Sequence, residues 1–167
     1  MARLVVSDDT LDDADRLAAA LVVLYAQPLS RVVSLTADHI TAGGGDVYLT
    51  VGSERIELPR PLAAIAVRLP RARRNGVADQ FQSRWLFPGS RAGRHLGASA
   101  LGQRLRAIGV EPRAMRLAAL YQLAGEIPPA MLAPLLGVTA STADRWSQLS
   151  RADYANYANY AAYHREP

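Results

Sequence analysis

Apolar residues recur at helical spacing in the first part of the chain. The spacing predicts a helix over residues 10–27 with one broad buried face, capped by Thr10 and ended by Pro28. Aspartates in its first turn favour the same assignment, because they interact well with the positive end of the helix dipole. The leucines that mark the buried face are Leu17, Leu21 and Leu24. Residues 29–40 then predict a short helical turn that descends into a strand or loop.

The pattern changes to alternation after three glycines at 43–45. Apolar residues at 47, 49 and 51 alternate with Tyr48 and Thr50, which is typical of a half-buried strand. Gly52-Ser53 supplies a turn, and Ile56 and Leu58 follow it. The segment therefore predicts a β-hairpin.

The rest of the chain returns to helical patterns separated by proline, glycine and polar stretches. Residues 75–83 are a polar linker, and residues 84–97 predict a short strand, a Pro-Gly turn and a basic loop. The expected helices are 61–74 (ended near Pro70), 99–110 (capped by Ser99), 113–127, one opened by Pro128-Pro129 and running to Gly137, and 141–150. The fold class is thus mainly α with a small antiparallel β-sheet.

The last segment, residues 151–167, places four tyrosines at intervals of three residues. This spacing spreads their rings over about half of a helix circumference. We expect a Tyr/Ala-rich C-terminal helix or tail that follows a domain over residues 1–150, and packing onto the chain's own core explains it better than base stacking does. The four residues are Tyr154, Tyr157, Tyr160 and Tyr163.

Composition narrows the class of protein. With 167 residues, half of them hydrophobic, the chain can bury one sizeable core. The absence of cysteine excludes disulfides and thiolate metal sites, the three histidines lack ligand spacing, and we expect no metal or cofactor. No apolar run approaches the roughly 20 residues of a membrane span. We expect a cytoplasmic, nucleoid-associated protein that does not enter membranes.

Positive charge is concentrated in the middle of the chain. All 19 basic residues are arginine, and residues 60–116 hold twelve of them against Asp79 and Glu111, a net charge of +10. Residues 1–15 hold five aspartates and one arginine. The basic segment is the expected footprint of a phosphate-binding face. The alternative is a solvated surface whose arginines pair with the acidic N-terminal segment.

The stretch MLAPLLGVTASTADRW, residues 131–146, permits two interpretations. It is similar to a helix-turn-helix with a turn at Gly137-Val138 and a second helix opened by Ser141 or Thr142. It is equally an altered active site in which Val138 and Trp146 have become core residues, and we favour core packing for these two.

The order of parts resembles the catalytic domain of the tyrosine recombinase (phage integrase) family. The segments that carry the resemblance are LTADHI, IELPRPL, WLFPGSRAGRHLGASALGQRLRAIGV and LAPLLG, which look like degenerate integrase-like proteins of actinobacteria. The resemblance covers almost the whole chain. The family's separate N-terminal DNA-binding region has no counterpart, which leaves open that the chain is a fragment of a longer protein.

The resemblance implies a catalytic site that has lost most of its groups. The family uses two arginines, a lysine and histidines to stabilise the phosphate, and a tyrosine nucleophile to attack it. The first arginine position reads Pro28, with Arg31 displaced by three residues, and there is no lysine for the hairpin. In the motif that holds the second arginine, Arg113 and Leu117 stand in place of the histidines and Arg116 survives. The last histidine position reads Val138, and the tyrosine position reads Trp146 or, without one deletion, Ser147.

We therefore expect double-stranded DNA binding without strand cleavage, because tryptophan has no nucleophilic oxygen. The residues expected to contact DNA are Arg116, Arg113, Arg145, Ser141, Thr142, Arg91, Arg94, Arg104 and Arg55. A cluster at Arg71, Arg73 and Arg74 would add salt-sensitive affinity. The alternatives are a module that assembles with itself or with an active recombinase through the tail, a helix-turn-helix regulator, and an active recombinase with relocated groups.

Overall fold

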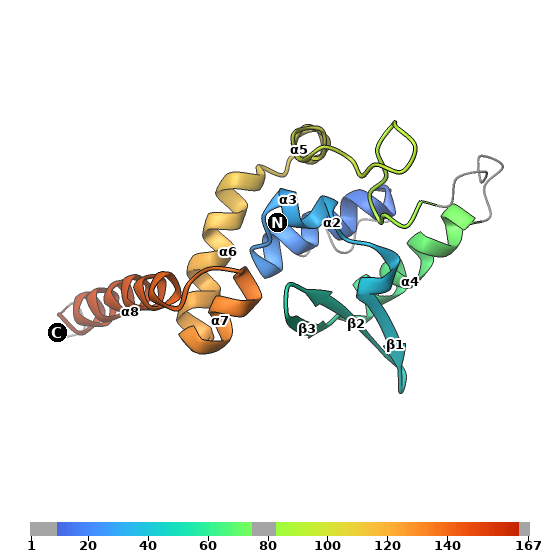
Figure 1. Cartoon of the computed structure of the whole chain (residues 1–167). Helices are drawn as coiled ribbons and strands as arrows, with labels where there is room; N and C mark the ends of the chain where they lie inside the picture. The colour runs from blue at the N-terminus through green and yellow to red at the C-terminus, as the bar shows by residue number, and fades with distance from the viewer. Residues whose placement is uncertain (1–9, 75–82, 164–167) are drawn as a thin grey trace.

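The computed structural model describes residues 10–74 and 83–163, with side chains for all of these except 71–74 and 153–163. Its elements are α2 Asp13–Tyr25, α3 Leu29–Val33, the 3₁₀ turn η1 Ala37–His39, β1 Ile40–Gly43, β2 Asp46–Val51, β3 Glu54–Glu57, α4 Arg60–Arg74, α5 Ala98–Ala107, α6 Pro112–Glu126, α7 Pro129–Leu136 and α8 Ala140–Tyr163. The prediction of a mainly helical fold with a small antiparallel sheet is confirmed (Figure 1). Among the described helices, none is long and apolar enough to cross a membrane.

Helix α2 is central and largely buried, with Leu17 and Leu21 fully inaccessible. The prediction that Thr10 caps it is wrong, because the Asp12 carboxylate accepts the free backbone N–H groups of Ala14 and Asp15 at 2.9 and 3.4 Å. The helix ends at Tyr25 rather than at Pro28 as predicted, because the next residue, Ala26, adopts the left-handed conformation at φ 52°.

The three strands form an antiparallel sheet in the order β1-β2-β3, so the predicted hairpin is confirmed and gains a third strand. Leu49 pairs with Ile40 on one side and with Ile56 on the other. This apolar row packs into the core, as period-two alternation requires. The β2–β3 turn, Gly52-Ser53, points its backbone toward α7.

Three predicted helix boundaries are corrected by the structure. Helix α4 does not end near Pro70 but continues to Arg74, with Leu69 buried just before the proline. Helix α5 is preceded by Gly97 without any side-chain cap, and Ser99 lies exposed inside it. Helix α8 begins at Ala140, because Thr139 Oγ1 accepts the Thr142 backbone N–H at 3.3 Å. Tertiary packing and local hydrogen bonds, rather than residue type alone, decide these ends.

Pro129 opens α7 as predicted, and Pro112, the residue before the predicted 113–127 helix, opens α6; each proline occupies the first turn, where a missing N–H costs nothing. Helix α8 runs through residue 150 without a break, so the expected tail continues the helix that precedes it. The side chains of the four tail tyrosines, and those of Arg71, Arg73 and Arg74, lie outside the described residues.

The described part of the chain has two apolar clusters. The first joins α2, α3, the sheet, α4 and α5, and the second joins Ala26 with α6, α7 and α8. Figure 1 shows the sheet and α4 on one side of α2 and the α6–α8 unit on the other. The loop between α2 and α3 lies where the two clusters meet, and it carries the candidate site.

Candidate nucleic-acid interface

The α2–α3 loop, Ala26 to Pro28, holds an arginine from α6. The Nε–H of Arg116 donates to the Ala26 carbonyl oxygen at 2.8 Å. Ala26 is the one non-glycine residue with positive φ in the described part of the chain, and it is fully buried. A left-handed residue at this point turns the chain after α2, so the loop fixes the position of the Arg116 side chain.

Arg31 approaches the same loop from α3. Its Nη1 group donates to Gln27 Oε1 and to the Leu135 carbonyl oxygen, both at 3.1 Å. Gln27, only 1% exposed, also donates through Nε2 to the carbonyl oxygens of Leu135 and Tyr25 at 3.1 and 2.8 Å. Arg31, on a helix of the first apolar cluster, is thereby hydrogen-bonded to the C-terminal end of α7, a helix of the second cluster.

Two glycines leave the room that the Arg31 guanidinium occupies. A Cβ atom on Gly137 would lie 2.9 Å from Arg31 Cζ, and one on Gly52 would lie 3.8 Å from Nη1. Gly137 also ends α7 in the left-handed conformation at φ 66°. The hairpin turn, the end of α7 and α3 therefore converge on one guanidinium.

The electrostatics of this cluster favour an anion. Burial holds the pKa of the half-buried Arg116 below its ordinary value, and the positive charge of Arg31 lowers that pKa further. Within residues 10–70 and 83–152, whose side chains are described, neither arginine forms an ion pair. Two neighbouring, partly desolvated cations without a carboxylate between them attract a phosphate group strongly.

A pocket of about 280 Å³ opens beside Arg116. Four apolar residues line it together with Gln27, Arg116 and the exposed Arg113, and the two arginines come from the start of α6. Pro28 also lines this pocket as the residue before α3. We use "arginine cluster" below for Arg31, Arg113 and Arg116.

The positions that the resemblance assigns to lost catalytic groups differ in their burial and contacts. Val138 and Trp146 are half-buried and pack against the second apolar cluster, at its edge rather than inside it. Leu117 is 54% exposed on α6. Ser147 is buried, and its hydroxyl has no hydrogen-bond partner among the described residues.

No protein-family model matches the sequence, and no curated protein matches it. A solved structure described as a crystal structure of XerA recombinase superposes with a TM-score of 0.67, over 99% of this chain and 62% of the other, at 11% identity. The fold is that of a tyrosine recombinase. The chain spans about 62% of the length of XerA recombinase, and at this identity the likeness concerns the fold alone.

On this recombinase fold, the sequence interpretation missed Arg31. By resemblance, the first-arginine position falls on Pro28, and Arg31 lies three residues further along the chain. The structure brings the Arg31 guanidinium, and not Pro28, against Gly137 and within electrostatic reach of Arg116. An offset of three residues along a chain corresponds to nearly one helical turn, which a long arginine side chain can span.

Two arginines of the basic segment are neutralised by the acidic residues at the start of α2. Arg104 pairs with Asp15 at 2.9 Å and with Asp12 at 3.4 Å, and Arg68 grips Asp13 with two hydrogen bonds of 2.7 and 2.8 Å. Arg104 therefore has less positive charge to offer DNA than an unpaired arginine has. For these two side chains the alternative of pairing with the acidic N-terminal segment is correct.

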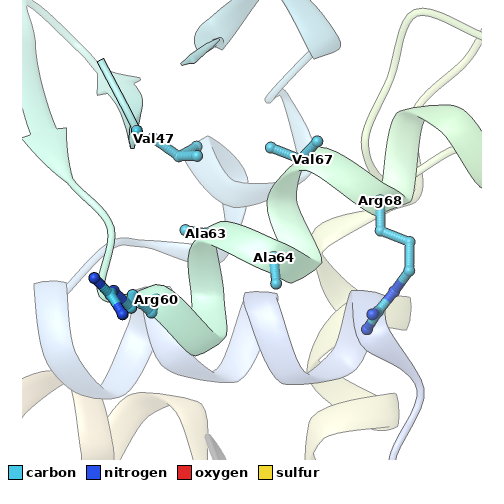
Figure 2. Close-up of a pocket in the computed structure, with 7 residues that line it drawn as sticks. Val47, Arg60, Ala63, Ala64, Val67 and Arg68 are labelled. Carbon is cyan, nitrogen blue, oxygen red and sulfur yellow. The ribbon is translucent and has the colours of Figure 1, made fainter. Parts of the chain in front are cut away.

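Arg68 also lines a cavity of about 580 Å³ along α4, between that helix and the β1–β2 turn. Figure 2 shows Arg60 and Arg68 at the two ends of a row formed by Ala63, Ala64 and Val67. Because Arg68 is already paired with Asp13, this cavity offers less positive charge to a phosphate than the arginine cluster does.

The remaining predicted DNA contacts are surface residues that the structure does not bring into the arginine cluster. Arg55 stacks on the Tyr48 ring at 3.9 Å, and the Ser141 and Thr142 hydroxyls bond to Thr139 Oγ1 at 3.1 and 2.9 Å. Those two hydroxyls thus have partners within the first turn of α8. The other exposed arginines of this predicted set are Arg91 and Arg94, which line a pocket of about 400 Å³ in the loop before α5, and Arg145 on α8.

Proposed function

We propose that this chain binds double-stranded DNA by holding a backbone phosphate at Arg31 and Arg116, and that it does not cleave the strand. The observation that carries the proposal is the pair of guanidinium groups gathered at the α2–α3 loop without a carboxylate partner among the described residues. The tyrosine recombinase fold supports DNA as the source of that phosphate.

The binding mechanism is electrostatic. Arg31 donates from Nη1 to the Leu135 carbonyl oxygen and to Gln27 Oε1, and Arg116 donates from Nε to the Ala26 carbonyl oxygen. The N–H groups that these bonds do not use remain for phosphate oxygens. Such charge-assisted hydrogen bonds are stronger than neutral ones, and held donors lose less entropy on binding. Exposed arginines such as Arg91, Arg94 and Arg145 add contacts that depend on salt but not on sequence.

The absence of cleavage follows from the groups that the chain offers. Trp146, at the position where the resemblance places the nucleophile, has no oxygen with which to attack phosphorus. The hairpin turn Gly52-Ser53 brings no lysine to the cluster, because the chain contains none. Val138 cannot donate a proton to a leaving oxygen. Two arginines can hold and polarise a phosphate, but without a nucleophile and an acid they cannot exchange its ester bonds.

The test is fluorescence anisotropy with a random 30-base-pair duplex across a salt series. Arg31→Ala and Arg116→Ala should each weaken binding by about tenfold or more, the loss expected for one charge-assisted hydrogen-bonding group. The control is Arg106→Ala, which removes the same charge from an exposed site on α5, on the far side of α3 from α7 in Figure 1. Equal affinities of all three variants and the unsubstituted chain would refute the proposal.

A second candidate function is protein assembly, and one observation favours it. Among the residues with described side chains, three large apolar ones are more than half exposed: Leu117 at 54%, Met131 at 63% and Leu149 at 51%. They lie on α6, α7 and α8. A second copy of the chain, or an active recombinase, would be the partner. Light scattering of the chain with and without residues 151–167 distinguishes the two functions, because DNA gripping by the arginine cluster does not require the tail.

A further inference from the structure

Gln27 contacts the cluster but carries no charge, and its burial is unusual. Its side chain is 1% exposed, although an amide that is removed from water costs free energy unless it is hydrogen-bonded. The structure satisfies this requirement through three hydrogen bonds: one from Arg31 Nη1 to Oε1, and two from Nε2 to the carbonyl oxygens of Leu135 and Tyr25.

These bonds form a closed arrangement of three partners. Arg31 Nη1 bonds to Gln27 Oε1 and to the Leu135 carbonyl oxygen, and Gln27 Nε2 bonds to that same carbonyl oxygen, each at 3.1 Å. The amide thus offers an acceptor to the guanidinium and a donor to the end of α7. An amide supplies both, whereas a carboxylate lacks the donor and an apolar side chain lacks both.

We propose that Gln27 is a positioning residue that fixes the Arg31 guanidinium for phosphate binding. The inference rests on the proposed function, and it assigns to Gln27 a role exerted wholly through Arg31. With the amide in place, one Nη1 group is anchored at two points, and the rest of the guanidinium is held against Gly137. Without it, the arginine side chain gains rotamers that must be lost again when a phosphate binds.

A double-mutant cycle tests the inference with the same 30-base-pair duplex. Gln27→Met keeps the side-chain length and removes the amide, and it should weaken binding about fivefold to tenfold, the effect of roughly one hydrogen bond to a charged group. In an Arg31→Ala background the same substitution should change the affinity by less than about twofold. A role in the fold alone would weaken binding equally in both backgrounds.

The outcomes separate the two proposals. If Arg31→Ala binds DNA as the unsubstituted chain does, the proposed function fails, and the role of Gln27 fails with it. If Arg31→Ala binds weakly while Gln27→Met binds normally, or if the two losses add, only the positioning role is overturned. Urea denaturation shows whether each variant is folded.

A charged variant covers the case in which Gln27→Met does not fold. Gln27→Glu has nearly the same shape and places a carboxylate beside Arg31 Nη1, where it would neutralise the arginine and repel the Leu135 carbonyl oxygen. This variant should weaken DNA binding more than the loss of the amide does and should flatten the salt dependence. Normal binding by Gln27→Glu would contradict the positioning role.

Discussion

Gly137→Ala separates the two roles of the glycine that ends α7. Its φ of 66° lies in the left-handed region, where any residue with a Cβ atom costs about 1–2 kcal/mol. The added methyl group would also lie 2.9 Å from Arg31 Cζ and 3.3 Å from Nη1. The guanidinium must therefore move, and its two hydrogen bonds at 3.1 Å must weaken.

Gly109→Ala is the matched control. Gly109 follows α5 with φ 80°, and a Cβ atom there would meet no described atom within 4 Å. We expect Gly109→Ala to lower the free energy of unfolding by about 1–2 kcal/mol and to leave DNA affinity unchanged. Gly137→Ala should lower it by about 2–4 kcal/mol, since hydrogen bonds to a charged group contribute about 1.5–3 kcal/mol each when intact.

Urea denaturation followed by circular dichroism gives the two free energies, and anisotropy with the duplex gives the two affinities. The DNA affinity of Gly137→Ala should fall about as far as that of Arg31→Ala. Equal losses of stability in the two glycine variants, together with normal DNA binding by Gly137→Ala, would mean that Arg31 is not held against Gly137.

Further predictions concern the acidic residues of α2 and the residue at the nucleophile position. Arg104→Ala should cost about 1 kcal/mol or less, because the arginine is 46% exposed in its pair with Asp15, and should change DNA affinity by less than about twofold. The hydrogen bond from Arg68 lowers the pKa of Asp13 from its ordinary 3.8. The ion pair of Asp13 with Arg68 therefore stabilises the fold fully above about pH 3.8, and this stabilisation is lost as the pH falls through the lower pKa that Asp13 has in the folded protein. In Arg68→Gln, the urea midpoint should consequently fall less steeply below about pH 4 than it does in the unsubstituted chain. Trp146→Tyr should form no covalent adduct with a nicked suicide duplex. An adduct on denaturing gels would instead support the alternative that this fold can cleave DNA.

Much of the fold follows from local patterns in the sequence. The hairpin is marked by alternation around Gly52-Ser53, and α6 and α7 are marked by prolines in their first turns, so the elements are predictable from residues that act locally. Helix ends are less predictable. Asp12 rather than Thr10 caps α2, because the choice depends on which side chain reaches two free amides in the folded backbone.

The candidate site was only half predictable. Arg116 belongs to a motif that a resemblance can place, whereas Arg31 fits no register and is identified by where its guanidinium lies. Gln27 offered no signal in the sequence, because a buried amide is recognised only from its burial and its partners. The charge of the basic segment predicts a phosphate-binding face, but not every arginine in the segment is available for it. Arg68 and Arg104 are paired with aspartates of α2 that lie far from them in the sequence.

The central claim, that Arg31 and Arg116 together hold one phosphate, is tested most directly by the salt dependence of the double variant. Each phosphate contact contributes about 0.9 to the slope of log affinity against log salt concentration. If both arginines hold one phosphate, Arg31→Ala/Arg116→Ala should lower that slope by about 0.9, and each single variant by less. A reduction of about 1.8 would mean two separate phosphates, and an unchanged slope would mean that neither arginine contacts DNA.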